Sequence, residues 1–205
     1  MNDHYPVITI SLMITIGIVS LMGFTNYSII NQYKHYPYYE WREKSYYRWI
    51  SCTFLHGNYM HLFLNLFVLW QFGSLIEQIY MVKFGFWQGA LVYLALYFAL
   101  AVLSSIPTFF KHRENSDYAS IGASGVISGL LFIFILYFPT TMLSVFFFLP
   151  MPAWVFALLY LGFSWYASSK RQDGIDHEAH FYGAVFGVIA GLALDPQLVS
   201  KYLNY

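Results

Sequence analysis

The chain has 205 residues, of which 59% are hydrophobic, 22% aromatic and only 10% charged, and its mean hydropathy is +0.52. Soluble domains carry about 25% charged residues and disordered chains combine low hydrophobicity with high net charge, so the composition excludes disorder and argues against a soluble domain. Ten basic and ten acidic residues leave no basic surplus for nucleic acid, and a single cysteine, Cys52, excludes an internal disulfide.

Six apolar runs are interpreted as membrane helices, because a transmembrane helix needs about 20 apolar residues. The predicted spans lie at about 7–25, 50–76, 86–106, 120–137, 153–166 and 179–194. The first run, Val7–Thr25, has neither a basic flank nor a small-residue cleavage signal, so we interpret it as a retained helix and not as a signal peptide. The sequence therefore predicts an all-α membrane protein in which residues 1–205 form one membrane domain.

The connections between these spans differ in character. The segment 26–49 is polar and aromatic, and because Tyr and Trp favour the headgroup level of a bilayer, we expect a structured loop in the membrane interface. An aromatic belt with no further role is the simpler interpretation of the same residues. The connections 107–119 and 168–178 are predicted to be polar loops, and the apolar, proline-interrupted segment 139–152 is predicted to be an embedded connection.

Polar side chains inside a membrane span are costly and are therefore candidates for function. In the second predicted span, His61 and Asn65 are four residues apart and share one helix face, where both can donate hydrogen bonds into the bundle. His56, which the same span includes, lies five residues before His61 and thus on a different face of a straight helix. Hydrogen bonds that merely tie neighbouring helices together explain these residues equally well.

The fourth span opens with the small residues Gly122-Ala123-Ser124-Gly125, which leave the serine hydroxyl sterically open. Small residues also let another backbone approach, so a packing seam is the better explanation of this motif alone. The sixth span has a matching glycine face, for which a packing stripe is an equal alternative. This face consists of Gly183, Gly187 and Gly191, with His180 one turn before the first glycine.

The two small-residue faces predict a reactive pair if they pack together. The fourth and sixth spans are parallel by count, and Ser124 and His180 both lie near the start of their span. A nucleophilic serine needs an adjacent base, and an imidazole suits that task near neutral pH. His61, Asn65 and the free N–H groups at the start of the fourth helix offer donors to an oxyanion. Nucleophile, base and oxyanion donors are therefore all present.

On these residues the sequence resembles the rhomboid intramembrane serine proteases, from about residue 5 to 195. The matching motifs are His56-x4-His61-x3-Asn65 in the second span, Gly122-Ala123-Ser124-Gly125 in the fourth and Ala179-His180-x2-Gly183-x3-Gly187 in the sixth. Arg48 and Glu77 also fall where the family places supporting polar residues.

The resemblance implies a bundle of six transmembrane helices with a water-filled cavity open to one side. It implies a Ser124–His180 catalytic dyad that uses no acidic third member, metal or cofactor, and an oxyanion hole made by His61, Asn65 and the backbone N–H of Ser124. The implied partners are membrane lipid and single-pass membrane proteins, cut near the membrane boundary. An intact helix hides its carbonyls in its own hydrogen bonds, so the substrate must unwind before attack.

The sequence departs from the family pattern at two positions. The aromatic residue that often follows the serine by four positions and stacks on the catalytic histidine is Ser128 here. His180 therefore has less support on that side unless Tyr182 or another aromatic residue substitutes. The segment 26–49 corresponds to the membrane-embedded first loop of the family, and the Trp-Arg pair often found in that loop is Tyr47-Arg48 here.

The resemblance implies a multi-pass protein of the bacterial inner membrane, with both termini inside and the active site on the extracytoplasmic side. The distribution of charge favours the reverse orientation under the positive-inside rule. The even-numbered connections and the two ends carry only Lys83 and Lys201 as basic residues. We expect the family orientation, because packing within a fold constrains topology strongly.

Three alternatives remain open at the level of sequence. An intramembrane metalloprotease would need His-Glu-x-x-His, and the run His177-Glu178-Ala179-His180 is one residue short of that motif. A metal site made by four histidines, His56, His61, His177 and His180, is the remaining form of this alternative. A catalytically inactive relative would bind transmembrane clients without cutting them. A small transporter would also use broken spans with polar residues inside the membrane.

Overall fold

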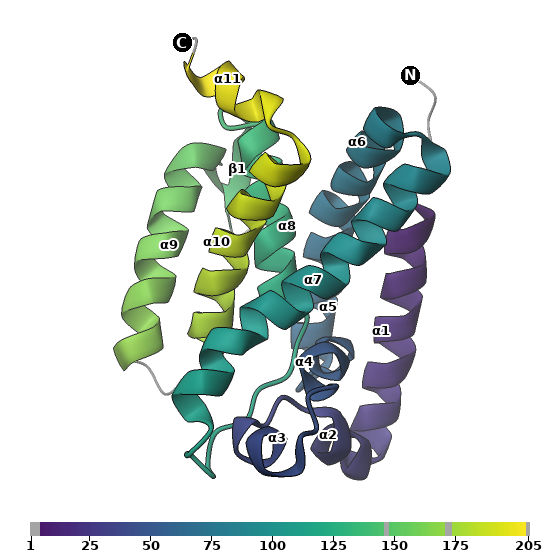
Figure 1. Ribbon diagram of the computed structural model, residues 1–205, viewed down its shortest axis with the longest axis vertical. Helices are drawn as coiled ribbons and strands as arrows, with labels where there is room; N and C mark the ends of the chain where they lie inside the picture. Colours follow the sequence, from purple (N-terminus) through teal and green to yellow (C-terminus); the bar gives the residue numbers. More distant parts are fainter. Residues whose placement is uncertain (1–4, 146–147, 171–173, 204–205) are drawn as a thin grey trace.

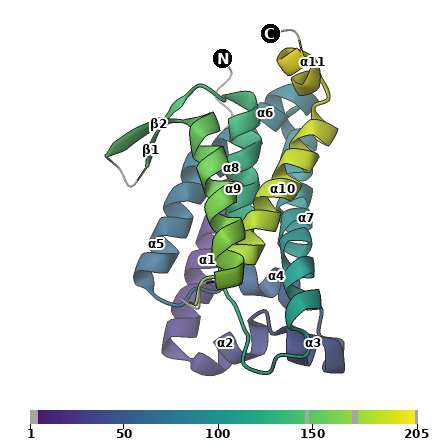
Figure 2. The same ribbon diagram turned by 90° about the vertical axis from the view of Figure 1, so that its left-hand side faces the viewer.

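The computed structural model describes residues 5–145, 148–170 and 174–203 as an elongated bundle of helices (Figures 1 and 2). In chain order the elements are α1 (Val7–Thr25), α2 (Tyr27–Tyr33), α3 (Pro37–Glu43), α4 (Arg48–Ser51), the 3-10 turn η1 (Cys52–Phe54), α5 (Tyr59–Val68), the π-helical turn η2 (Leu69–Gly73), α6 (Ser74–Phe84), α7 (Phe86–His112), α8 (Ser124–Tyr137), β1 (Met142–Val145), β2 (Leu149–Pro152), α9 (Ala153–Lys170), α10 (His177–Leu194) and α11 (Gln197–Leu203). This architecture confirms the all-α membrane fold class.

Three helical segments of the described ranges are long and apolar enough to cross a membrane: Val7–Thr25, Tyr59–Phe84 and Phe86–His112. The apolar helix α8 is shorter. Helices α9 and α10 have 18 residues each, a length of about 27 Å against a hydrocarbon core of about 30 Å. The chain is therefore an integral membrane protein by its apolar helices, and the count of six spans stays a prediction.

The predicted bounds of the second span, 50–76, are wrong at both ends. The helix begins only at Tyr59, where the side chain of Asn58 accepts a hydrogen bond from the His61 N–H at 2.8 Å and so caps the first turn. It then continues through η2 and α6 to Phe84, and Gly85 at φ 90° ends it. His56 consequently lies in the connection before the helix and not inside a span.

The predicted loop 107–119 is wrong over its first six residues, because α7 continues through Pro107 to His112. A proline inside a helix removes one backbone hydrogen bond. The aromatic packing of Phe109 offsets this loss: its ring centroid lies 5.3 Å from that of Trp49 and 6.2 Å from that of Trp41. The last turns of α7 are thus held by the aromatic first loop.

The remaining differences lie at helix ends and in the connection 139–152. Helix α8 begins at Ser124 and not at 120, α9 extends to Lys170, and α10 begins at His177. The described part of 139–152 contains an antiparallel hairpin, in which Met142 pairs with Pro152 and Val145 with Leu149. Residues 146–147 of this connection and 171–173 of the loop 168–178 lie outside the described residues.

Hydrogen bonds from α1 to a buried carboxylate on α6 explain the position of α1. The buried carboxylate of Glu77 accepts hydrogen bonds from the N–H groups of Ile8 at 2.8 Å and Thr9 at 2.7 Å, which are free donors of the first turn of α1. Figure 1 shows α2–α4 at one end of the bundle, with the start of α1 and helix α11 at the other.

Candidate active site

The structure brings Ser124 and His180 together. The Oγ atom of Ser124 lies 2.6 Å from Nε2 of His180, within hydrogen-bond distance. Ser124 is the first residue of α8, and His180 lies in the first turn of α10, so both side chains stand at the same end of two adjacent helices. The arrangement places an imidazole where it can remove the proton of the serine hydroxyl.

Glycines allow the two helices to approach this closely. A Cβ atom on Gly183 would lie 2.0 Å from the carbonyl oxygen of Gly125, and one on Gly187 would lie 2.3 Å from that of Gly129. No real side chain tolerates such distances, so the backbones of α8 and α10 are in direct contact. The glycine face of α10 thus meets the small-residue face of α8 and fixes the separation of the serine from the histidine.

The chain that precedes Ser124 is held by its backbone. Gly122 adopts φ 130°, a conformation that a side chain rarely takes, and its N–H donates to the carbonyl of Cys52 at 3.0 Å. A Cβ atom here would also lie 2.9 Å from Cε1 of His61. Because Gly122 has no side chain, the His61 ring can pack beside the start of α8.

Asn65 and His56 occupy supporting positions around His61. The Asn65 amide donates to the backbone carbonyl of His61 at 2.8 Å, and among the described residues no hydrogen bond joins Asn65 to Ser124. An amide has two N–H bonds, so one donor can still serve an incoming oxyanion. His56 is fully buried, with Nδ1 2.9 Å from the hydroxyl of Ser20 and its ring centroid 4.8 Å from that of His61.

An aromatic ring from α9 lies beside His180, where the sequence has Ser128 in place of an aromatic residue. The centroid of Tyr160 is 6.5 Å from that of His180, with the two rings inclined by 27°. The Tyr160 hydroxyl is 2.5 Å from Oγ of Ser128. The Ser128 hydroxyl itself donates to the backbone carbonyl of Ser124 at 2.7 Å. Tyr182 packs on Phe181 and Phe186 instead. Sequence analysis did not single out Tyr160, because no spacing rule connects it to Ser128.

Asp176 is a second residue that sequence analysis did not identify. Its carboxylate accepts hydrogen bonds from the Ala179 N–H at 2.8 Å, from Ser120 Oγ at 2.9 Å and more weakly from Thr108 Oγ1 at 3.4 Å. It thereby caps α10 and ties that helix to α7 and to the segment before Ser124. The only available signal was an acidic residue placed just before a predicted helix.

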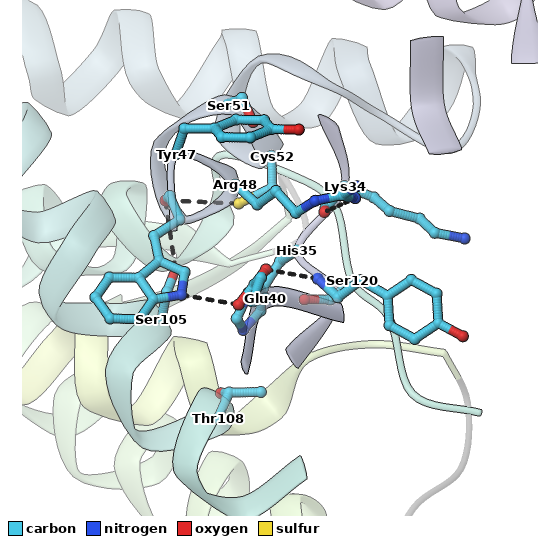
Figure 3. A network of polar contacts seen from close by, with 12 residues as sticks. Lys34, His35, Glu40, Tyr47, Arg48, Ser51, Cys52, Ser105, Thr108 and Ser120 are labelled. Atoms are coloured by element: carbon cyan, nitrogen blue, oxygen red, sulfur yellow. Dashed lines mark hydrogen bonds and ion pairs between the residues drawn. The ribbon is translucent and has the colours of Figure 1, made fainter. Parts of the chain in front are cut away.

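The first loop reaches the same segment through His35. Its backbone pairs with that of Ser120, and its Nδ1 lies 2.8 Å from the buried carboxylate of Glu40 (Figure 3). A cavity of about 20 Å³ between the loop and α8 is lined by His35, Ser120 and Ser124 among others, which is room for about one water molecule. The described residues contain no group of three or more His, Cys, Asp or Glu side chains placed to hold a metal ion.

Fold and site together define a helical integral membrane protein with a serine–histidine pair at the adjacent starts of α8 and α10. Residues 43–197, more than half of the chain, match the Rhomboid domain family, and the chain belongs to that family.

The chain is similar to several curated proteins. It is 28% identical over 172 residues to the rhomboid protease GlpG of Haemophilus influenzae, covering 83% of this chain and 80% of that protein. It is 29% identical over 147 residues to the mitochondrial rhomboid protein 1 of Saccharomyces cerevisiae, and 38% identical over 84 residues to RHOMBOID-like protein 4 of Arabidopsis thaliana. These matches cover 69% and 41% of this chain but only 40% and 18% of the yeast and plant proteins.

Proposed function

We propose that this chain is an intramembrane serine endopeptidase that cleaves transmembrane helices of client membrane proteins near the membrane boundary. The observation that carries the proposal is the 2.6 Å separation of Ser124 Oγ from His180 Nε2. Membership of the Rhomboid family and similarity to a named rhomboid protease support it.

In the proposed mechanism, Ser124 Oγ attacks the carbonyl carbon of the scissile bond while His180 takes the hydroxyl proton. The carbonyl oxygen becomes an oxyanion, stabilised by the backbone N–H of Ser124 and by donors from His61 and Asn65. Protonated His180 then delivers the proton to the leaving amine, and an acyl ester remains on Ser124. Water, deprotonated by the same imidazole, hydrolyses this ester and restores the serine.

Residues around Ser124 and His180 are proposed to hold the two side chains in position. We assign Tyr160 to the role that an aromatic residue at position 128 would have, because its ring lies against that of His180. Gly122 and Gly125 leave room beside the serine for the side chains of His61 and Ser104, while Gly183 and Gly187 allow α10 to pack against α8. Arg48 and Glu77 act at a distance, by holding the first loop and α1.

The substrate is proposed to be a single-pass membrane protein whose helix unwinds near the site, since a helix with all its hydrogen bonds offers no carbonyl to attack. We propose that residues 1–205 act as one membrane domain of six spans and need neither metal nor cofactor. The proposed location is the bacterial inner membrane, with the active site on the extracytoplasmic side. Single cysteines introduced at the start of α1 and in α3, which lie at opposite ends of the bundle, would test that orientation by their accessibility from outside the cell.

The deciding experiment is covalent labelling of the detergent-solubilised chain with a fluorophosphonate probe. The parent, Ser124→Ala, His180→Ala and the control Ser11→Ala, which removes an exposed serine on α1, are run together. Labelling of the parent and the control alone establishes an activated serine. No labelling of a folded parent would contradict the proposal and favour a client-binding protein without activity. Cleavage of a transmembrane reporter, lost in Ser124→Ala, completes the test.

A further inference from the structure

A second pocket lies in the first loop, away from the serine–histidine pair. It has a volume of about 250 Å³ and lies between the end of α2, the start of α3 and α4. Its lining combines two cationic side chains with tyrosine and amide groups: Asn31, Lys34, Tyr36, Tyr39, Glu43 and Arg48. None of these residues contacts Ser124 or His180 in the described hydrogen bonds, so the pocket is separate from the proposed active site.

The guanidinium of Arg48 is held rigidly in this pocket. The residue is only 8% exposed, and its Nη1 donates to the backbone carbonyls of Asn31 at 3.0 Å and Lys34 at 3.2 Å. These carbonyls lie at the end of α2, where helix carbonyls lack partners within the helix. Figure 3 shows the side chain of Arg48 extending toward the backbone of Lys34. No carboxylate of the described residues lies within ion-pair distance of Arg48, so its charge is not neutralised.

Lys34 adds a second positive charge to the same pocket. Its ammonium donates to Oδ1 of Asn31 at 3.0 Å and lies 5.0 Å from the centre of the Tyr36 ring. Partial burial, followed by the neighbouring charge of Arg48, lowers the pKa of Lys34. Two cations that disfavour each other's charge would both be stabilised by an anion placed beside them.

Three of the other basic residues in the described ranges have carboxylate partners, whereas Lys44 and Arg113 lie over the Trp41 ring. Arg42 pairs with Glu114 at 3.0 Å, Lys83 with Asp195 at 2.6 Å and Lys111 with Glu178 at 3.1 Å. Within the described ranges, Lys34 and Arg48 form no such pair. Glu43 also lines their pocket, but its exposed carboxylate makes no ion pair with either cation there. The pocket therefore presents two positive charges that an external anion could bind.

We infer that this pocket binds a phosphate group, with Arg48 as the fixed and Lys34 as the adjustable cation. Arginine and lysine are the usual protein partners of phosphate. The surrounding loop is rich in tyrosine and tryptophan, which favour the headgroup level of a bilayer, so the headgroup of an anionic phospholipid is the favoured source. The volume is slightly below the roughly 300 Å³ typical of the smallest drug-sized pockets, which suits a headgroup.

The test uses the purified full chain in a neutral detergent and follows its thermal unfolding by tryptophan fluorescence. Phosphatidylglycerol, phosphatidylcholine and inorganic phosphate are titrated separately, since a ligand that binds the folded state raises Tm with its concentration. Lys34→Gln removes one pocket charge. Lys44→Gln is the matched control, because Lys44 is exposed and contacts the Trp41 ring outside the pocket. Lys34→Arg retains the positive charge, so it separates the loss of that charge from a general effect of substitution at position 34 on folding.

We expect phosphatidylglycerol to stabilise the parent at lower concentration than phosphatidylcholine. Lys34→Gln should need about fivefold more phosphatidylglycerol for the same rise in Tm, while Lys44→Gln and Lys34→Arg should behave as the parent. Equal weakening by Lys34→Gln and Lys44→Gln would show diffuse attraction and overturn the inference, as would no preference for the anionic lipid. Protection by inorganic phosphate equal to that by the lipid, and sensitive only to Lys34→Gln, would support the phosphate site and identify free phosphate as its ligand.

Discussion

Helices α10 and α9 both pack against α8, but α10 does so through its backbone and α9 through a side chain (Figure 2). Helix α10 meets α8 backbone to backbone, since a Cβ atom on Gly187 would lie only 2.3 Å from the Gly129 carbonyl oxygen. Helix α9 makes contact through a side chain, with the hydroxyl of Tyr160 against that of Ser128. A backbone contact leaves no room for adjustment, whereas a side chain can change rotamer. The separation of serine and histidine thus depends on α10, and the environment of the histidine ring on α9.

Adding a methyl group to the α8–α10 contact should have the largest effect. In Gly183→Ala the new Cβ would lie 2.0 Å from the Gly125 carbonyl oxygen, so the helices must separate. Overpacking of this kind costs about 1–3 kcal/mol or more. We expect a clear fall in Tm together with loss of fluorophosphonate labelling, because Ser124 and His180 move apart.

The matched control for this variant is Gly162→Ala on α9, where nothing lies within 4 Å of the new Cβ atom. Its Tm and labelling should stay at the level of the parent, or its Tm should rise slightly, because alanine favours a helix over glycine. Equal damage by Gly162→Ala and Gly183→Ala would contradict the distinction between the two helices.

The same contrast explains how much the sequence could reveal. The glycine contact was predictable, because Gly183, Gly187 and Gly191 recur at helical spacing and a close backbone contact requires residues without side chains. The bounds of the second span were not, because Asn58 caps a helix that hydrophobicity alone would start earlier. The partners of Glu77 and Tyr160 were not predictable either, since both contacts join helices far apart in the sequence and depend on how those helices pack.

The proposed oxyanion donors belong to neither α9 nor α10, and Asn65→Ala tests whether α5 contributes to the reaction. We expect turnover to fall by about a hundredfold if Asn65 donates to the oxyanion, with KM nearly unchanged. Cleavage of a transmembrane reporter in proteoliposomes provides both constants. The amide already bonds to the His61 carbonyl, so Tm must be measured as well. Unchanged turnover would mean that the Ser124 N–H and His61 suffice.

The pH dependence of cleavage tests the role of the histidine that α10 brings to the serine. A general base must be neutral to accept the serine proton, so activity is present at higher pH and is lost as the pH falls and the imidazole gains a proton. We expect initial rates to fall at least about tenfold between about pH 8 and about pH 5. A flat profile over this range, in a protein whose Tm does not change, would contradict the assignment of His180 as base.

Removal of the α9 contact should have the smallest effect and should leave the fold intact. Tyr160→Phe keeps the ring beside His180 but removes the hydrogen bond to Ser128, worth about 1 kcal/mol, so we expect about a fivefold fall in turnover. Tyr160→Ala also removes the ring contact, worth about another 1 kcal/mol, so the loss should grow to about thirtyfold.

The neighbouring ring of Phe156, 5.5 Å from that of Tyr160 and also on α9, provides the comparison variant Phe156→Ala. If Tyr160 acts by positioning His180, its variants should lower turnover and alter the pH profile while Phe156→Ala does neither. The same fall in both alanine variants, in proportion to their loss of Tm, would mean that α9 only packs against α8. In that case the orientation of His180 would depend on α10 alone, and the serine at position 128 would need no aromatic substitute.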